Sequence, residues 1–173
     1  MKFSRIFAMP SADTFSVPPI GAFVRRYLEQ SLVSVDPFAR NNAWATYTND
    51  LNPDTSAQHH LDAEQFLILL AREGICADLV LFDPPYSPRQ ISECYKRVGR
   101  DDGMAATQNA ALYRRVRDVI PAVMPRGGIV LSFGWNSTGM GKKHGAILEE
   151  ILLVNHGGAH NDTICVAERC ASV

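Results

Sequence analysis

ADLVLFDPPY, at residues 77–86, is the stretch that decides the fold. Residues 77–82 are apolar apart from Asp78 and rich in strand-forming side chains, which predicts a short strand with both faces buried. The two prolines after Asp83 cannot donate backbone hydrogen bonds, so the strand must end there. The sequence therefore predicts a core strand that runs directly into a rigid turn with a carboxylate at its corner.

Strand and helix patterns alternate on both sides of this strand, as is typical of an α/β domain. Before it, the expected elements are a helix over 19–30, strands over 31–35, 44–48 and 57–61, and a helix over 62–73 with Asp62 as its N-cap and Gly74 at its end. After it, they are a loop over 87–106 with a short helix near 91–98, a helix over 107–123, a strand over 129–133, and a hairpin of 146–155 with 161–168 around Gly157 and Gly158.

We predict a single α/β domain that spans residues 1–173. With 173 residues, 46% of them hydrophobic, the chain can bury one core and has little room for a second domain. Its sheet should be mostly parallel, with a C-terminal antiparallel hairpin. The connections between the first strands are shorter than the dozen or so residues of a usual parallel crossover, so minimal helices are expected there.

The distribution of charge is uneven, although the net charge is only −1. Residues 87–126 carry eight Arg and Lys side chains against four acids. A basic segment of this kind suits a polyanion such as a nucleic acid. An ordinary solvated helix face with scattered arginines would have the same composition.

Membrane, disulfide and metal functions find no support in the sequence. No apolar run approaches the ~18 residues of a membrane span, and residues 1–10 lack the apolar centre of a secretory signal, so a cytoplasmic location without membrane contact is expected. The four cysteines have no CxxC spacing and are expected to be free thiols. His156 and His160 lack further ligands at metal-binding spacing, so no metal site is predicted.

Acidic residues follow the first four predicted strands. Asp36, Asp50, Asp62 and Asp83 each stand at or just after the end of one of them. The carboxyl ends of parallel strands meet at one edge of a sheet, and open α/β sheets bind their ligands at that edge. We therefore expect these four acids to lie on one rim and to mark the functional site.

The turn of Asp83, Pro84, Pro85 and Tyr86 is the strongest functional signal. Its carboxylate and a free carbonyl are both acceptors, and together they can hold an NH2 group by its two hydrogens. That grip draws the nitrogen lone pair out of conjugation with the ring and makes an exocyclic amine nucleophilic. The ring of Tyr86 can stack on a planar base, an interaction worth about 1–3 kcal/mol per base. The alternative is a strand-to-loop turn without chemistry.

On these residues the chain resembles the amino-methyltransferases that modify DNA, and most closely the small phage-associated N6-adenine methyltransferases. The resemblance spans nearly the whole chain and implies a Rossmann-like class I fold that binds S-adenosyl-L-methionine (SAM). It implies that Asp83 and the Pro84 carbonyl bind the adenine N6 and that Tyr86 stacks on the flipped base. The substrate would be adenine in DNA, in a bacterial host or a phage-infected cell.

The same resemblance implies which residues bind the cofactor. The family continues its cofactor loop with glycines in an FxGxG pattern, whereas this chain has Arg40 and Asn42 at those positions. The residues implied to contact SAM are Asp36, Pro37 and Phe38 in that loop, Asp50 and Leu51 at the ribose, Asp62 and Ala63 near the adenine, Phe15 and Pro18 around the methionine end, and Asp83 of the turn.

Contacts to DNA are expected from basic residues that grip phosphates and from residues that lie near the base. Sequence-specific members of the family carry an extra recognition domain, for which this chain has no room. Relaxed or short-site specificity is therefore expected, or a homodimer or partner protein that supplies recognition. The residues expected to contact substrate are Tyr86, Arg89, Lys96, Arg97, Arg100, Trp135 and Asn136.

Three alternatives fit the sequence less well. An RNA base methyltransferase, for example one that acts on guanine N2 of rRNA, uses a similar acidic Pro-Pro-aromatic turn. A protein glutamine methyltransferase would be expected to have Asn in place of Asp83. A catalytically silent SAM-fold module that binds nucleic acid is favoured by Arg40 and Asn42 in the cofactor loop.

Overall fold

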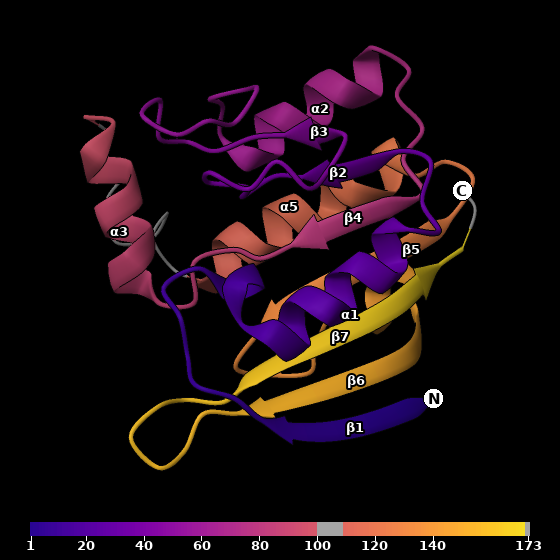
Figure 1. Ribbon diagram of the computed structural model, residues 1–173. Coiled ribbons are helices and arrows are strands. Elements are labelled where there is room, and N and C mark those ends of the chain that lie inside the picture. Colours follow the sequence, from indigo (N-terminus) through magenta and orange to yellow (C-terminus); the bar gives the residue numbers. More distant parts are fainter. Residues whose placement is uncertain (100–108, 172–173) are drawn as a thin grey trace.

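A seven-stranded mixed sheet forms the centre of the protein (Figure 1). The computed structural model describes residues 1–99 and 109–171. The strand order across the sheet is β1-β6-β7-β5-β4-β2-β3. The strands are β1 (Lys2–Phe7), β2 (Ser34–Asp36), β3 (Tyr47–Thr48), β4 (Leu79–Phe82), β5 (Gly128–Gly134), β6 (Ile147–Asn155) and β7 (Thr163–Cys170).

β7 is the strand that departs from the parallel arrangement. It pairs antiparallel with both β5 and β6, whereas the other neighbouring strands pair in parallel. The β6–β7 connection contains Gly157, whose φ of 83° lies in the left-handed region that favours glycine. The prediction of a mostly parallel sheet with a C-terminal antiparallel hairpin is confirmed.

Helices cover both faces of the sheet (Figure 1). α1 (Pro18–Leu28) packs on one face, in a core that includes Phe23 and Leu131. α2 (Ala63–Arg72), α3 (Pro88–Arg97) and α5 (Asn109–Val123) contribute to the core on the other face. Short 3₁₀ helices lie at η1 (Thr14–Ser16) and η2 (Lys142–His144). Within the described ranges, no helix has the length and apolarity needed to cross a membrane.

α1 also covers the sheet where a crossover helix is missing. Residues 37–46, which join β2 to β3, contain no helix. Trp44 from this connection instead packs against Phe15, with ring centroids 5.6 Å apart, and beneath the guanidinium of Arg25 from α1. The prediction of minimal helices between the first strands is therefore confirmed, and a helix that precedes β2 takes over the covering role.

The strand predicted over 57–61 is wrong. This segment makes a single isolated parallel bridge, between Asn49 and His59. His59 makes two backbone hydrogen bonds there, to the amide of Asp50 at 3.0 Å and the carbonyl of Thr48 at 3.1 Å. The buried side chain of Asn49 adds two more, because the amide of Leu61 donates to Asn49 Oδ1 at 2.9 Å and Asn49 Nδ2 donates to the Leu61 carbonyl at 2.9 Å.

β1 is an edge strand that the sequence analysis does not predict. It pairs in parallel with β6 and is largely exposed. Lys2 and Arg5 interrupt the apolar residues Phe3, Ile6 and Phe7, which obscures the strand pattern but is typical of protected edge strands.

The short helix predicted near 91–98 within the 87–106 segment is confirmed as α3, which begins three residues earlier than predicted. Ser87 is its N-cap, Pro88 lies in its first turn, and Gln90 completes a capping box with Ser87. These local signals outweigh the weak apolar periodicity of the segment. Residues 100–106 of the predicted loop lie outside the described residues.

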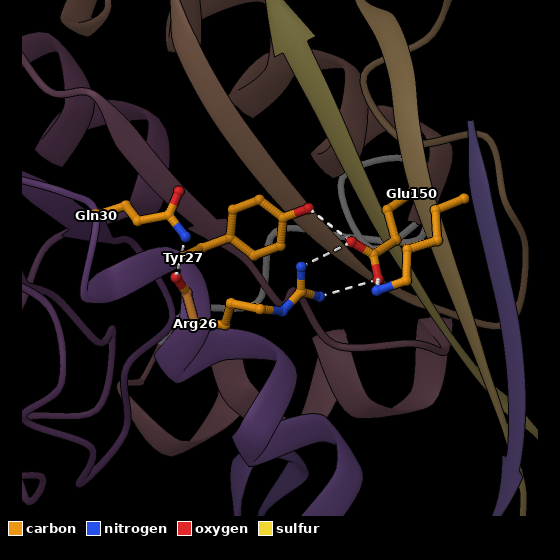
Figure 2. A network of polar contacts seen from close by, with 5 residues as sticks. Arg26, Tyr27, Gln30 and Glu150 are labelled. Atoms are coloured by element: carbon orange, nitrogen blue, oxygen red, sulfur yellow. Dashed lines mark hydrogen bonds and ion pairs between the residues drawn. The ribbon is translucent and has the colours of Figure 1, made fainter.

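A polar network ties α1 to Glu150 of β6 (Figure 2). Arg26 donates to both carboxylate oxygens of Glu150 at 3.0 and 2.9 Å, and the Tyr27 hydroxyl donates to the same group at 3.0 Å. Lys2 of β1 adds an ion pair at 3.3 Å. Burial opposes ionisation of Glu150, but its hydrogen bonds from Arg26 and Tyr27 outweigh that effect and lower its pKa.

Glu150→Ala is expected to lower the free energy of unfolding by about 1–3 kcal/mol, because it leaves Arg26 and Tyr27 without their acceptor. The folded-state pKa of Glu150 is lowered, so its stabilisation is complete above the unfolded pKa of about 4.3 and is lost as the pH falls through the folded value. Urea denaturation at pH 7 and at pH 3 measures both effects. Glu149→Ala is the control, since Glu149 pairs with Arg169 at the surface and should cost at most about 1 kcal/mol.

Candidate active site

The carboxyl ends of β2, β3 and β4 bring three of the predicted acids together. Asp36 is the last residue of β2, Asp50 lies two residues after β3, and Asp83 follows β4 directly. The charges of Asp83, Asp50 and Asp13 all act on the carboxyl of Asp36. Asp13, Asp36, Asp50 and Asp83 are called the acidic cluster below. Asp13, from the N-terminal segment, is the member that strand-end reasoning does not identify.

The side chain of Tyr86 turns back toward the corner of its own turn. Its hydroxyl donates to Asp83 Oδ1 at 2.5 Å and lies 3.5 Å from the hydroxyl of Thr14. Its ring contacts Trp135 edge-on, with centroids 5.8 Å apart. Burial and the charge of Asp83 raise the pKa of Tyr86 well above its usual value, so the hydroxyl stays protonated and acts as the donor.

The two prolines of the turn differ in how their carbonyls are used. The Tyr113 hydroxyl, from α5, donates to the Pro85 carbonyl at 3.1 Å. Among the residues that the structure describes, no donor is bonded to the carbonyl of Pro84. The turn therefore holds a free backbone acceptor next to the Asp83 carboxylate, which is the pair that an NH2 group requires.

Burial governs the ionisation of Asp83. Desolvation raises the pKa of its carboxyl to about 6, and hydrogen bonds from Tyr86 and Thr14 offset only part of the rise. The positive charge of Arg40 also lowers this pKa, whereas Asp13 raises it. A carboxyl with a pKa near 6 is ionised at neutral pH but can still accept a proton during a reaction.

Asp36 is even more enclosed, at 1% exposure. Desolvation raises its pKa well above the usual value, the amide of Phe38 opposes the shift, and the other members of the acidic cluster add to it. Buried carboxylates that repel one another are stabilised by a cation among them. The acidic cluster is therefore suited to a positively charged ligand.

The predicted cofactor loop adopts a glycine-like conformation without glycine. Arg40 has a φ of 54°, in the left-handed region, which costs a non-glycine residue about 1–2 kcal/mol. Its amide donates to Asp50 Oδ2 at 3.2 Å, and its guanidinium donates to the Ala12 carbonyl at 2.5 Å. Asn42 donates to Asp13 Oδ1 at 3.1 Å. Both substituted positions thus hold the N-terminal segment over the loop.

Asp50 and Asp62 each have structural partners. Asp50 Oδ1 accepts from the amide of Asn52 at 2.8 Å. Asp62 caps α2 by accepting from the amide of Glu64 at 3.1 Å, and it also accepts from the Tyr95 hydroxyl at 2.7 Å. A carboxylate has about four acceptor positions, so the bonds from the amides of Arg40 and Asn52 leave room at Asp50 for a ligand hydroxyl or amine.

The other predicted cofactor residues differ in their exposure. Phe15 and Ala63 are buried in the two cores, so their side chains pack inside the protein. Leu51 is partly buried against the core that contains α2. Pro18 is exposed in the first turn of α1. The buried Pro37 accepts from Asn49 through its carbonyl, and the Phe38 ring packs edge-on against Phe82.

A cavity of about 410 Å³ opens beside Tyr86, the last residue of the turn formed by Asp83, Pro84, Pro85 and Tyr86. This volume lies within the range of about 300–1,000 Å³ that is common for small-ligand sites. A second hollow of about 550 Å³ shares Trp135, His160 and Asn161 with it. Neither hollow is lined by Asp36, Asp50, Asp83 or Pro84, and Tyr86 is the residue of the turn that borders the first one. The residues that border the first cavity include Thr14, Tyr86, Gln90, Trp135, His156 and Asn161.

The residues predicted to contact DNA lie on α3 and after β5. Arg89 pairs with Glu93 at 2.9 Å on the exposed side of α3, and Lys96 is exposed on the same helix. Arg97 ends α3, and Arg100 lies outside the described residues. Trp135 is 47% exposed and borders both hollows. Asn136 is exposed and accepts from the amide of Thr138 at 3.0 Å.

Two arginines of the basic segment 87–126, Arg115 and Arg117, contact other side chains of the protein instead of pointing freely into solvent. The guanidinium of Arg117 lies 5.4 Å from the ring centroid of Phe82 and 5.3 Å from that of Tyr113. Arg115 lies 3.7 Å from Glu64 and 3.4 Å from the Tyr95 hydroxyl. Arg115 therefore contacts α2 and α3, and Arg117 contacts β4 and its own helix. The number of basic residues in the segment thus overstates the charge available to a polyanion.

Tyr113 and Gln90 are the residues at the turn that the sequence analysis misses. Gln90 could have been found, because a glutamine three residues after Ser87 is a capping-box pattern. Tyr113 could not, since its contact with Pro85 depends on how α5 packs against β4.

Solved structures match the fold, although no family model matches the sequence and no curated protein does so. The proposed methyltransferase SMU.776, in complex with SAH, is 10% identical with a TM-score of 0.56, over 85% of this chain and 48% of that chain. TrmN from Thermus thermophilus is 17% identical with a TM-score of 0.56, over 88% and 49%. The proposed methyltransferase yhhF from Escherichia coli is 11% identical with a TM-score of 0.50, over 96% and 89%. The chain spans about half the length of the first two and has the predicted Rossmann-like methyltransferase fold.

Proposed function

We propose that the protein is a SAM-dependent methyltransferase that modifies the exocyclic N6 amino group of adenine in DNA. The observation that carries the proposal is the pair of acceptors at the catalytic turn. The Asp83 carboxylate and the Pro84 carbonyl belong to the same turn as Tyr86, whose hydroxyl is bonded to Asp83 and whose side chain borders a cavity together with Trp135. The crystallised neighbour in complex with SAH supports the choice of cofactor.

The acidic cluster fits SAM by its charge. SAM carries a sulfonium and an ammonium group, and buried carboxylates with raised pKa values gain from such cations. Asp36 and Asp83 would face the positive charges, and Asp50 would accept from the ribose hydroxyls. When bound, SAM supplies an activated methyl group on a positively charged sulfur.

The residues of the turn orient and deprotonate the amine. Asp83 and the Pro84 carbonyl each accept one of its hydrogens, so the nitrogen lone pair leaves the ring plane and becomes available. Positioning of this kind can supply most of the rate enhancement. Methylation replaces one amino hydrogen, and the Asp83 carboxylate, whose pKa is about 6, can take the released proton.

The site is suited to a base that has left the stack. A target adenine must be extruded from a duplex at a cost of a few kcal/mol. The rings of Tyr86 and Trp135 offer stacking surfaces beside the turn, and exposed Lys96 on the neighbouring helix offers a phosphate contact. We further propose that a second copy of the chain or a partner protein supplies target recognition.

Transfer of labelled methyl groups from SAM to separate substrates tests this function. Duplex DNA and single-stranded DNA should both accept label on adenine, with the rate falling steeply as salt rises. Label in rRNA but not in DNA would replace the DNA assignment by an RNA assignment. Calorimetry that detects DNA binding without SAM binding would identify a silent module instead.

Tyr86→Phe is expected to move the pH dependence of kcat/KM upward by about one unit. The rate should fall in the wild type as the pH drops through about 6, because protonation removes the carboxylate acceptor. The variant keeps the ring but loses the hydrogen bond that lowers the pKa of Asp83. Tyr113→Phe is the control, since the Tyr113 hydroxyl binds Pro85 and should leave the midpoint in place. An unchanged midpoint in Tyr86→Phe would mean that Asp83 is not the titrating group.

A further inference from the structure

Gln90 has an amide group whose direction is fixed by the capping box of α3. Its Oε1 accepts from the amide of Tyr86 at 2.8 Å and from the amide of Ser87 at 3.1 Å. The amide of Gln90 in turn donates to Ser87 Oγ at 3.2 Å. The side chain is thereby attached to the last residue of the catalytic turn.

The orientation of this amide follows from chemistry as well as from geometry. Both of its partners are backbone N–H donors, so only the carbonyl oxygen of the side chain can face them. The NH2 group must therefore point away from the cap. Gln90 borders the 410 Å³ cavity together with Tyr86 and Trp135, and no described residue accepts a hydrogen bond from its NH2 group.

We propose that the Gln90 NH2 group donates to the ring-nitrogen acceptor beside the target amine and so contributes to the choice of base. This inference rests on the proposed function. The amine of adenine is flanked by N1 and N7, which are both acceptors. Asp83 and Pro84 would then accept from the two hydrogens of the amine. Gln90 would donate to the ring nitrogen next to that amine.

The match discriminates against a base that presents a donor next to its amine. The N2 amine of guanine lies between the N1–H donor and the N3 acceptor, so a Gln90 NH2 group on the N1 side would face a donor. Gln90 is exposed in the free protein, and an unpaired donor weakens binding once the bound base excludes water from it. Gln90 is therefore a specificity-determining residue for the proposed reaction, and Asp83 and Pro84 remain the groups that hold the amine.

Gln90→Glu tests the proposal with little change in shape. Glutamate is a usual residue at this position of a capping box, so its carboxylate can accept from Tyr86 and Ser87 as the amide does. The atom that faces the cavity changes from a donor to an acceptor. We expect kcat/KM on adenine in DNA to fall about 10- to 100-fold, while the SAM dissociation constant changes less than twofold and Tm does not fall.

Gln65→Glu is the matched control. Gln65 is exposed at the same position of α2, three residues after the N-cap Asp62, and it does not border the cavity. The substitution adds the same charge to the same part of a helix. It should leave kcat/KM within twofold of the wild type.

Substrate analogues separate this inference from the proposed function. DNA with 1-deazaadenine or 7-deazaadenine at the target lacks one acceptor at a time. The analogue that lacks the nitrogen bound by Gln90 should lower kcat/KM of the wild type about as much as Gln90→Glu does. The same analogue should cause no further loss of kcat/KM in the Gln90→Glu variant. If the wild type methylates adenine but the effects of both analogues simply add to that of Gln90→Glu, the Gln90 inference is overturned and the proposed function stands. If the wild type methylates no adenine, the proposed function fails with it.

Discussion

Asp83→Ala is expected to lower the rate of methyl transfer to DNA at least about 100-fold, because the target amine loses the acceptor that orients it. The Pro84 carbonyl alone can hold one hydrogen but cannot fix the direction of the lone pair. Initial rates with labelled SAM at pH 8 measure the loss. Asp54→Ala, at an exposed turn position outside the acidic cluster, is the control and should retain the wild-type rate.

The ionised carboxylate of Asp83 should also lower the free energy of unfolding. Its folded pKa of about 6 exceeds the unfolded value of about 3.9, so the folded state loses stability as the pH rises from about 4 to about 6. Asp83→Asn keeps the acceptor for Tyr86 without the charge. At pH 7 this variant should be more stable than the wild type, by at most about 3 kcal/mol, and the difference should vanish below about pH 4. Equal stability at both pH values would contradict the burial argument.

Asp36→Asn is expected to weaken SAM binding about 10- to 100-fold, since it removes a buried charge from the acidic cluster and keeps the side-chain shape. Asp36 accepts from the amide of Phe38 at 2.9 Å, and an asparagine oxygen can do the same, so the loop should remain in place. Calorimetric titration with SAM measures the dissociation constant. Asp54→Asn serves as the control.

Binding that is unchanged in Asp36→Asn would mean that the cofactor does not use the acidic cluster. Linkage provides a second measurement on the wild type. Because the pKa values of Asp36 and Asp83 are raised, a cation that binds beside their ionised forms should release protons. Its affinity should fall as the pH drops through the pKa of Asp83, which is about 6.

The parts of the fold that follow from local sequence could be predicted. The apolar run before Asp83 identifies β4, the N-cap Asp62 and Gly74 bound α2, and the glycines at 157–158 identify the hairpin. The edges of the sheet could not, because their pairing depends on distant residues. The segment 57–61 is held by a single bridge and by the side chain of Asn49, and β1 forms only because β6 lies beside it.

The candidate site was predictable where it follows from strand ends and less so where it depends on packing. Asp36, Asp50 and Asp83 gather because parallel strands end on one rim. The orientation of the Tyr86 hydroxyl toward Asp83 follows only from the folded turn. Arg40 replaces an expected glycine because the Ala12 carbonyl and Asp50 stabilise its left-handed backbone, and neither contact is visible in the local sequence.

The most direct test of the acceptor pair at the catalytic turn is mass spectrometry of nucleosides from DNA incubated with deuterated-methyl SAM. The wild type should yield N6-methyladenine that carries the label, and Asp83→Ala should yield at least about 100-fold less. Equal amounts from both proteins, or label on another position of the base, would contradict the assignment of Asp83 and Pro84 to the adenine amine.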